Sequence, residues 1–416
     1  MRVVLWVIGA GLVARTAVMA FDAAPTRLGP LEYSVIADHL NTGRGFTFEQ
    51  YGTTYRAWKE PLYTVLLAGL MRWGGRGDLS ILAFQWSCGI GAALVVAWLT
   101  RRLLGDPASA LVAGLLVAMN PFLVYYDTHW IHPLSLDVLL FLLVTATILL
   151  AAWERRVRMR WSIIAGLVMG LALWERSALL VSGVAAWIAA LCLAPRHDRG
   201  LMVRRAAIWL GVALLVIAPW LARNHHLFGR VLMTTDSAHV FWLGNNPVSN
   251  GTYSDMAGRR VIESADPAFL TRLHGAPELA QYDLFRAEAW RFITQHPRRF
   301  FELFRGKLWA FIWFAPNAGV QYTALEGWLY RAAYAALLLL GLCGFALWWV
   351  TAERRGRHQM VLVLSAVAGL AVVHALMAIN MKHRVPWEMV LAIFAAQAVT
   401  RGGRQLSRFL HGSLLS

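Results

Sequence analysis

Long runs of apolar residues alternate along this chain with short polar segments. A transmembrane helix needs about 17 to 25 predominantly apolar residues. The pattern predicts ten membrane-spanning helices, at about residues 3–21, 80–100, 108–126, 132–152, 161–175, 177–194, 206–222, 328–350, 360–379 and 386–400. Glu175 and Arg176 form the only charged break within 161–194, which predicts a tight hairpin with this pair at its tip. The first run has a second interpretation as a cleaved signal peptide, although Arg15 interrupts it.

The loops between these runs differ in charge, and this difference predicts their side of the membrane. Lys and Arg are enriched in short cytoplasmic loops. With ten spans, both chain ends and the arginine-rich short loops fall on one face, which we predict to be cytoplasmic. The arginines of that face are Arg101, Arg102, Arg155, Arg156, Arg158, Arg160, Arg196, Arg199, Arg204, Arg205, Arg354, Arg355, Arg357, Arg401, Arg404 and Arg408. The opposite, exoplasmic face receives three segments, at about residues 22–79, 125–131 and 223–327.

Parts of the exoplasmic segments repeat apolar residues at helical spacing. Residues 30–42 do so and are followed by glycines, which favour a helix end. Residues 61–73 do so behind Pro61, which favours a helix start. Both stretches are too short to span a bilayer, so we predict helices that lie at the outer interface. Residues 279–315 carry a third helical pattern in which basic residues stand beside Phe and Trp, as is typical of a membrane–water boundary.

Composition agrees with a chain that crosses the membrane many times. The 416 residues are 58% hydrophobic and 15% charged, the mean hydropathy is +0.51, and a soluble domain is about a quarter charged. These values exclude a disordered, a fibrous or an ordinary soluble protein. The predicted fold class is an all-α polytopic membrane protein. Its predicted parts are a transmembrane core with the first exoplasmic loop (1–222), an exoplasmic domain (223–327) and C-terminal spans with a basic tail (328–416).

Net charge and cysteine content indicate which partners, disulfides and metal sites the sequence does not predict. A net charge of +16 would suggest nucleic acid in a soluble protein, but here the membrane loops explain it and no nucleic-acid partner is predicted. Cys88, Cys192 and Cys343 each lie in an apolar run, without a C-x-x-C pair or a Cys/His ligand spacing. We therefore predict neither a disulfide framework nor a cysteine-based metal site.

Carboxylates at the outer interface are candidates for proton transfer. A membrane enzyme that acts on a lipid phosphate needs cations for the phosphate and a carboxylate that takes a proton from the acceptor hydroxyl. Glu32 and Asp38 lie on the first interfacial helix, and either is a candidate base. The alternative for both is a solvated helix face, with Glu32 placed favourably near the helix N-terminus. Asp22 ends the first span and has the alternative of an interfacial anchor.

Basic groups occupy three exoplasmic positions. Lys59 precedes the second interfacial helix, where it can reach lipid phosphates or contact headgroups in general, and Glu60 beside it can cap the helix. Arg176 at the hairpin tip can reach a phosphate or pair with Glu175. The short loop 380–386 holds Lys382, His383 and Arg384, and this much positive charge in an outer loop favours a phosphate site.

A possible metal site involves four residues around the short loop 125–131. Asp127, His129, His132 and Asp137 flank it, and such side chains can bind a divalent metal, although their spacing matches no strong ligand motif. The sequence requires no cofactor, and a divalent metal at this loop is an option.

Five stretches, in order, are similar to motifs of one family. They are Glu32–Phe46, Lys59-Glu60-Pro61-Leu62-Tyr63, Leu173-Trp174-Glu175-Arg176-Ser177, Pro219–Arg230 with Leu243–Pro247, and Lys382-His383-Arg384-Val385-Pro386. Together they resemble the GT-C glycosyltransferases that use polyprenyl-phosphate sugars. Within this group the chain most resembles bacterial relatives of the protein-O-mannosyltransferase and aminoarabinose-transferase families. These relatives are similar to members of glycosyltransferase family 39.

The resemblance implies an enzyme of the bacterial inner membrane with an exoplasmic active site. It would move a monosaccharide, with inversion, from a polyprenyl-phosphate donor to a hydroxyl of an acceptor. The acceptor would be a lipid, a glycan or a protein, and membrane lipids would surround the enzyme. By position Glu32 would be the base, with Asp22, Asp38 and Asp127 as alternatives, because relatives carry an acid where this chain has Gly29. The implied phosphate contacts are Lys59, Arg176, Lys382 and Arg384. The implied further substrate contacts are Tyr33, Glu60, Tyr63, Arg223, Asn245 and Asn246, of which the two asparagines have the alternative of forming a turn.

Two other protein classes compete with this interpretation. A transporter or lipid flippase should keep ionisable groups near the bilayer midplane and show paired halves. The spans hold few such groups (Asp137, Arg331 and His374), and no internal repeat is visible. A structural membrane subunit would leave the basic loop 380–386 and the interfacial acids without a role.

Overall fold

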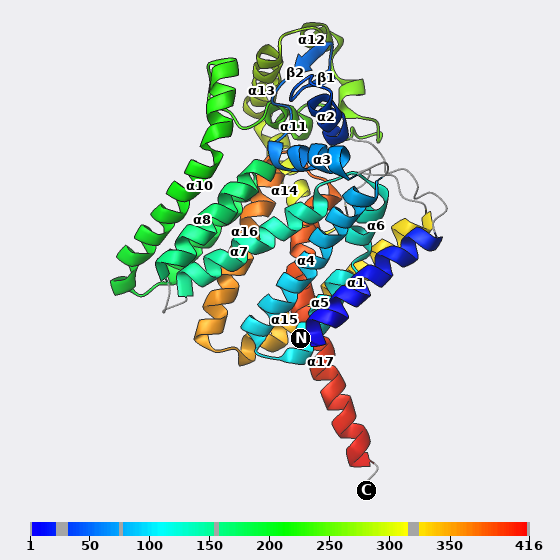
Figure 1. Cartoon of the computed structure of the whole chain (residues 1–416), viewed down its shortest axis with the longest axis vertical. Helices are drawn as coiled ribbons and strands as arrows, with labels where there is room; N and C mark the ends of the chain where they lie inside the picture. Colours follow the sequence, from blue (N-terminus) through cyan, green and yellow to red (C-terminus); the bar gives the residue numbers. More distant parts are fainter. Residues whose placement is uncertain (1, 22–31, 75–77, 154–157, 315–323, 414–416) are drawn as a thin grey trace.

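The computed structural model describes residues 2–21, 32–74, 78–153, 158–314 and 324–413, and these are mainly helical (Figure 1). A bundle of long helices forms one part of the molecule. Its elements are α1 (Arg2–Phe21), α4 (Leu79–Leu104), α5 (Pro107–Ala118), α6 (Pro121–His129), α7 (Leu134–Trp153), α8 (Arg158–Glu175), α9 (Leu179–Leu193), η1 (Arg196–Asp198), α10 (Arg199–Phe228), α15 (Ala324–Thr351), α16 (Arg354–Leu376), η3 (Met381–Arg384) and α17 (Val385–Ser413).

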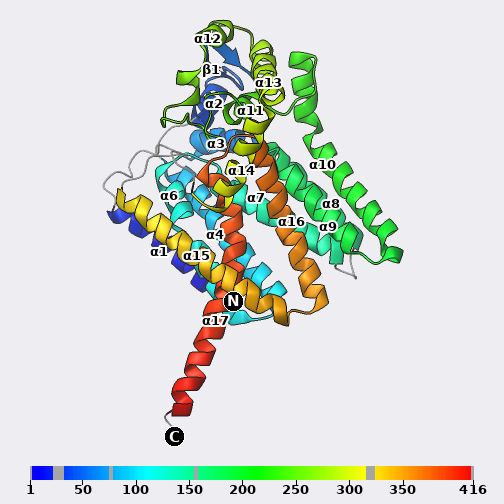
Figure 2. The same ribbon diagram turned by 180° about the vertical axis from the view of Figure 1, so that it is seen from behind.

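A second, smaller part covers one end of this bundle, and we call it the cap (residues 32–74 and 229–314). Its elements are α2 (Glu32–Asn41), β1 (Phe48–Gln50), β2 (Thr53–Tyr55), α3 (Pro61–Trp73), α11 (Asp236–Gly244), η2 (Val261–Ser264), α12 (Pro267–Leu273), α13 (Glu278–Gln295) and α14 (Pro297–Ile312). Trp242, Phe269 and Phe285 form an aromatic core inside it, in which the rings of Trp242 and Phe269 stack 5.0 Å apart. In Figures 1 and 2, α1 begins and α17 ends at the other end of the bundle.

Each of the ten predicted spans coincides with a helix or, in one case, a helix pair of the bundle. In the described residues, six helices are long and apolar enough to cross a membrane by themselves, namely α1, α4, α7, α10, α15 and α16. The pair α5–α6 adds a seventh crossing with a bend of 40°. Helices satisfy all their backbone hydrogen bonds internally, which the bilayer requires. The chain is therefore an all-α polytopic membrane protein, as its sequence predicts.

Two predicted helices are broken where the sequence supplies a proline. The span 108–126 divides at Asn120, whose side-chain oxygen accepts hydrogen bonds from the N–H groups of Phe122 (3.1 Å) and Leu123 (3.0 Å) and so caps α6. The stretch 279–315 divides into α13 and α14 at Pro297, which has no N–H for a continuous helix. Neither break was predicted from the sequence. The antiparallel hairpin β1–β2, with Tyr51 and Gly52 at positive φ in its turn, was not predicted from the sequence.

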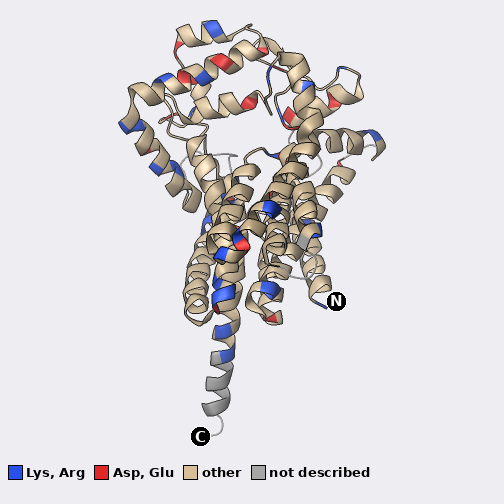
Figure 3. Ribbon diagram, turned by 90° about the vertical axis from the view of Figure 1, so that its left-hand side faces the viewer, with Lys and Arg blue, Asp and Glu red and all other residues tan. Residues whose placement is uncertain are grey.

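Charge is distributed unevenly between the two ends of the molecule. Figure 3 shows most acidic residues in the cap, whereas basic residues are the main charges at the other end of the bundle and along α17. This is the asymmetry from which the sequence predicts an exoplasmic cap.

Candidate active site

Two carboxylates hold the segment around Lys59 in place, because each accepts hydrogen bonds from a different part of the chain. The Glu60 carboxylate accepts hydrogen bonds from the Ser177 backbone N–H (3.1 Å) and hydroxyl (3.0 Å). In return the Glu175 carboxylate accepts one from the N–H of Tyr63 (2.8 Å), in the first turn of α3. Burial raises the pKa of Glu60. The start of α3 is thereby held against the α8–α9 hairpin tip, although the Glu60 side chain makes no capping hydrogen bond to α3 itself.

Lys59 itself lies between two carboxylates from different parts of the cap. Its Nζ is 2.8 Å from Glu32 Oε1, at the start of α2, and 2.6 Å from Asp236 Oδ2, at the start of α11. Burial raises the pKa of Glu32, but Lys59 outweighs that effect and leaves it below the ordinary value. Burial acts in the same direction on Asp236, yet Lys59 and His239 lower its pKa to about 2. Both carboxylates are therefore ionised at neutral pH.

A buried carboxylate joins the Lys59 segment to α11. Glu278 accepts hydrogen bonds from the N–H groups of Arg56 (2.7 Å) and Ala57 (3.0 Å) and from the Thr235 hydroxyl (2.7 Å). The Thr235 N–H donates to the Ala57 carbonyl over 2.8 Å. Because Glu278 binds the residues that precede Lys59 and Asp236, it sets their relative position.

Two further cations lie beneath this group, where the cap meets the bundle. Arg176 pairs with Asp137 of α7. The Nζ of Lys382 lies 3.1 Å from Nε2 of His132. Arg176 and Lys382 line one small cavity together with Asp137, His374 and His383, and the two imidazole rings stack 3.8 Å apart. Three cations from separate segments, Lys59, Arg176 and Lys382, thus face one region.

Lys382 has an unusually acidic ammonium for two reasons. Burial, Arg176 and Lys59 together lower its pKa to about 8. In addition, the Leu134 N–H donates to Nδ1 of His132 (3.0 Å), so a neutral His132 carries its proton on Nε2. This Nε2–H can donate only to an uncharged Lys382 amine, and a protonated Lys382 must give up the contact.

Tyr33 connects the two groups of charges. The Lys59 ammonium lies 5.6 Å from the centre of the Tyr33 ring. The ring also makes edge contacts with Tyr63 (5.4 Å) and His132 (6.2 Å). Tyr63 in turn donates its hydroxyl proton to Gln85 over 2.7 Å. We call Glu32, Tyr33, Lys59, Arg176, Asp236 and Lys382 the site cluster.

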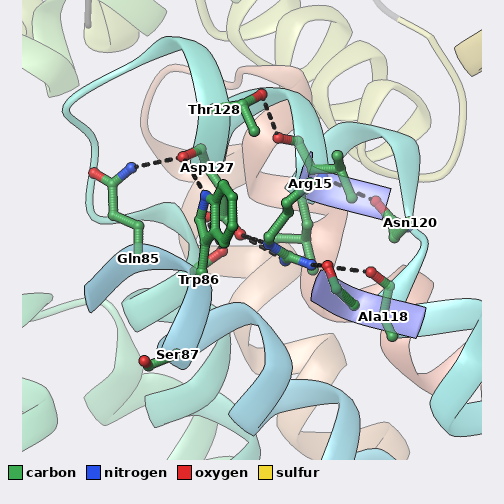
Figure 4. Close-up of polar contacts among 12 residues, drawn as sticks. Arg15, Gln85, Trp86, Ser87, Ala118, Asn120, Asp127 and Thr128 are labelled. Atoms are coloured by element: carbon green, nitrogen blue, oxygen red, sulfur yellow. Dashed lines mark hydrogen bonds and ion pairs between the residues drawn. The ribbon is translucent and has the colours of Figure 1, made fainter. Parts of the chain in front are cut away.

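Two other predicted carboxylates lie outside the site cluster. Asp38 is exposed and pairs with Arg44 over 2.8 Å. Asp127 is buried within the bundle, where one of its oxygens lies 2.6 Å from Arg15 and the other accepts from Ser135 over 2.6 Å. Figure 4 shows Arg15 directed toward both Asp127 and the Ala118 carbonyl. Asp22 is not among the described residues.

Arg384 and Arg223 contact residues outside the site cluster. Arg384 is fully buried, donates to Glu388 (3.2 Å) and to the Tyr330 hydroxyl (2.6 Å), and has its guanidinium 3.8 Å from the centre of the Tyr334 ring. Arg223 stacks on Trp220 at 4.5 Å and donates to the Arg56 carbonyl over 3.0 Å. The structure does not bring either guanidinium to the site cluster.

The two asparagines shape the cap, as the alternative interpretation of their turn predicts. Asn246 accepts from the N–H groups of Val248 and Ser249, both at 3.0 Å. Asn245 donates to the Leu376 carbonyl over 2.8 Å and accepts from the buried Lys307 ammonium over 3.1 Å. This contact fastens the cap to the end of α16.

The residues considered for a metal are not brought together. Asp127 pairs with Arg15, Asp137 with Arg176, and His132 contacts Lys382. Within the described ranges, no three His, Cys, Asp or Glu side chains form a group that could hold a metal ion.

Asp236 and Glu278 were not among the residues singled out from the sequence, and the stacking of His374 on His383 was not predicted. Asp236 stands in Thr-Thr-Asp-Ser before a helix, a pattern typical of a helix start and uninformative about ligands. Glu278 follows a proline at the start of α13, where a first-turn acid is ordinary. Only the folded chain shows that each lies beside residues more than 170 positions away.

Comparisons with known proteins found one family model and several solved structures that are similar to this chain. Residues 59–222 match the family model of the dolichyl-phosphate-mannose-protein mannosyltransferases. The archaeal oligosaccharyltransferase AglB from Archaeoglobus fulgidus, in complex with an inhibitory peptide and a dolichol-phosphate, is similar in structure, with 16% identity, a TM-score of 0.57, and 99% of this chain and 51% of that chain covered. ArnT from Cupriavidus metallidurans bound to undecaprenyl phosphate has 17% identity, a TM-score of 0.45, and 96% and 78% of the two chains covered. No curated protein matches the sequence.

The chain shares its polytopic helical fold with the archaeal oligosaccharyltransferase, and the family match is confined to residues 59–222. The family match includes Lys59 and Arg176 of the site cluster, and Glu32, Asp236 and Lys382 lie outside it. The chain spans about half the length of the archaeal oligosaccharyltransferase.

Proposed function

We propose that the protein is a membrane glycosyltransferase that moves a monosaccharide from a polyprenyl-phosphate donor to an acceptor hydroxyl on the exoplasmic side of a bacterial inner membrane. The observation that carries the proposal is the convergence of Lys59, Arg176 and Lys382 beside two ionised carboxylates, where the cap meets the bundle. A phosphate with an apolar tail requires this combination of cations and membrane depth. The family match and the dolichol-phosphate in the archaeal oligosaccharyltransferase support the same donor class.

The phosphate would lie between Arg176 and Lys382, with Lys59 close by. Lys382 is the cation best suited to bind it, because within the described part of the chain its ammonium contacts the imidazole of His132 and no carboxylate. Arg176 already faces Asp137, so it would share its guanidinium between that carboxylate and the phosphate. Positive charge at this position stabilises the phosphate as it departs with the bonding electron pair.

Glu32 would act as the base. The acceptor oxygen attacks the anomeric carbon from the side opposite the phosphate, its proton passes to Glu32, and the bond from carbon to the phosphate oxygen breaks with inversion. Glu32 is ionised and keeps 30% of its side chain accessible, whereas Asp236 is more buried and binds both Lys59 and His239. Asp236 therefore serves to orient Lys59. The acceptor would be a glycolipid, a cell-envelope glycan or a protein that reaches the cap.

Turnover of Glu32→Gln tests this assignment. A general base contributes about 10²- to 10⁴-fold to a rate, so release of polyprenyl phosphate from synthetic polyprenyl-phosphate hexoses and pentoses should fall by that factor. Donor binding should persist. Asp38→Asn, on the same helix, is the matched control and should turn over normally. Near-normal turnover of Glu32→Gln would remove Glu32 from this role.

A further inference from the structure

A large pocket outside the site cluster lies at the end of the bundle opposite the cap. It has a volume of about 810 Å³ and is formed where α7 and α9 end and where η1, α10 and α16 begin. A pocket of this size falls within the range of ordinary ligand sites. It lies far from the chemistry proposed above, at the other end of the long helices (Figure 1).

Four arginines give this pocket its charge. Arg196, Arg199, Arg354 and Arg355 line it, and Asp198 is the acid in its wall. Among the described residues no ion pair joins any of the four arginines to an acid, and Asp198 pairs instead with His197, which is not in the wall. The fifth arginine of the wall, Arg205, is already engaged, because it donates to the carbonyls at the end of α7. Among the described residues of the wall, an anion would therefore meet four guanidiniums that have no ion-pair partner and one carboxylate, that of Asp198.

Two helix N-termini add to this positive field. Arg199 is the first residue of α10 and Arg354 the first residue of α16, so the first turns of both helices form part of the wall. The first N–H groups of a helix have no partner within it and attract anions. The Arg199 N–H already donates to the Arg196 carbonyl of η1, so the helix starts contribute positive partial charge and the arginines supply the donors for an oxyanion.

The side of the pocket toward the membrane is apolar and continues into an exposed stripe. Cys192 of α9 lines the pocket and is exposed. Residues four positions apart lie on the same face of a helix, so Ile188 and Val184 follow Cys192 along α9. Ile188 is 57% exposed and Val184 is 39% exposed. A ligand whose phosphate occupies the arginines would have an apolar surface for hydrocarbon chains directly beneath it.

From these observations we propose that this pocket binds the phosphate headgroup of an anionic membrane phospholipid, with the acyl chains along Ile188 and Val184. A phospholipid and free phosphate both carry the phosphate oxyanion that the arginines would bind. The apolar stripe favours the phospholipid over free phosphate. A soluble anion would gain nothing from the exposed face of α9. The proposal is independent of the proposed transferase activity, because none of these residues belongs to the site cluster.

Native mass spectrometry of the purified full chain in a non-ionic detergent tests the proposal. The probes are phosphatidylglycerol and phosphatidylcholine with the same acyl chains, and inorganic phosphate is the competitor. Arg199→Gln/Arg354→Gln removes two wall cations. Arg160→Gln/Arg204→Gln is the matched control, since it removes two exposed arginines at the same end that do not line the pocket.

Wild type should retain phosphatidylglycerol in preference to phosphatidylcholine. Each basic residue near an anionic lipid contributes on the order of 1 kcal/mol, so the double wall variant should bind phosphatidylglycerol about 30-fold more weakly. If that variant does not fold, Arg199→Gln and Arg354→Gln alone should each weaken binding about fivefold. The control pair should bind as wild type does.

Three results would overturn the proposal. Equal retention of both lipids would show that the pocket does not select an anionic headgroup. Equal loss in the wall and control variants would assign the effect to general surface charge. Displacement of phosphatidylglycerol by inorganic phosphate at equal concentration would assign the pocket to a soluble anion.

Discussion

The chemistry of Lys382 is changed by where the fold places it. A lysine in a short outer loop would ordinarily stay charged well above neutral pH. Here burial and the neighbouring Arg176 and Lys59 lower its pKa to about 8, and the contact with His132 adds a hydrogen bond that only the neutral amine can accept. The affinity of the site for phosphate should therefore depend on pH.

Binding of polyprenyl phosphate should weaken as pH rises through about 8, the pKa of Lys382. Below that pH the ammonium is present, and above it the amine is neutral. Losing one charge-assisted hydrogen bond costs about 1.5 kcal/mol or more, so affinity should fall about tenfold. Lys382→Arg, which stays charged throughout, should lose this dependence. Isothermal titration calorimetry of both proteins between about pH 7 and about pH 9.5 measures their affinity for polyprenyl phosphate. This range extends roughly one unit or more to either side of the pKa. An unchanged wild-type affinity over that range would show that Lys382 does not bind the phosphate.

At the scale of single residues, the sequence predicts only part of the site cluster. Glu32, Lys59, Arg176 and Lys382 were candidates and lie together. Arg384 was a candidate because it is two positions from Lys382, yet the turn of η3 directs it to Glu388 and to aromatic rings. Periodicity says which residues share a loop, but the direction of each side chain depends on partners such as Tyr330 that are distant in sequence.

Among the elements, α1 is fixed to the bundle by one buried ion pair. Arg15 of α1 binds Asp127 of α6, and Ser135 of α7 completes the contact (Figure 4). Gly89 of α4 makes room for it, since a Cβ there would lie 2.3 Å from Arg15 Nη2 and 2.6 Å from Asp127 Oδ2. The break that Arg15 makes in the first apolar run is therefore a packing feature between helices.

Removing one partner of this pair should destabilise the protein strongly. Asp127→Leu leaves Arg15 charged and buried, which costs roughly 3–5 kcal/mol, whereas removing both charges is often neutral. Thermal unfolding in detergent should therefore show a large loss for Asp127→Leu and recovery in Arg15→Leu/Asp127→Leu. Asp38→Asn, which breaks an exposed pair with Arg44, should change stability by less than about 1 kcal/mol. A double variant as unstable as the single one would contradict the pairing.

Prediction at the level of elements succeeded where one stretch of sequence decides the outcome. The helices over 61–73 and 30–42 appear as α3 and α2, because apolar spacing and Pro61 act locally. The hairpin β1–β2 was not predicted, since its three-residue strands carry too little pattern. The division between α13 and α14 had a local signal in Pro297, and the strong amphipathic pattern on both sides obscured it.

The whole molecule is a membrane bundle with a cap, and the site cluster lies at the junction of the two. The long helices of the bundle follow from hydropathy because the bilayer restricts the chain to continuous apolar helices. The cap could not be derived in this way, since its two halves, 32–74 and 229–314, meet only in the folded chain. Glu278, which bonds to Arg56 and Ala57, is an example of a contact that no local pattern reveals. We propose that a polyprenyl phosphate binds at this junction.

The most direct test of this account is mass spectrometry of the lipids that remain on the purified protein after polyprenyl-phosphate sugar is added. Wild type should retain polyprenyl phosphate or its glycosylated form. Lys382→Met should retain much less, and Arg223→Gln, outside the site cluster, should retain as much as wild type. Retention of bulk phospholipid alone by all three proteins would contradict the account.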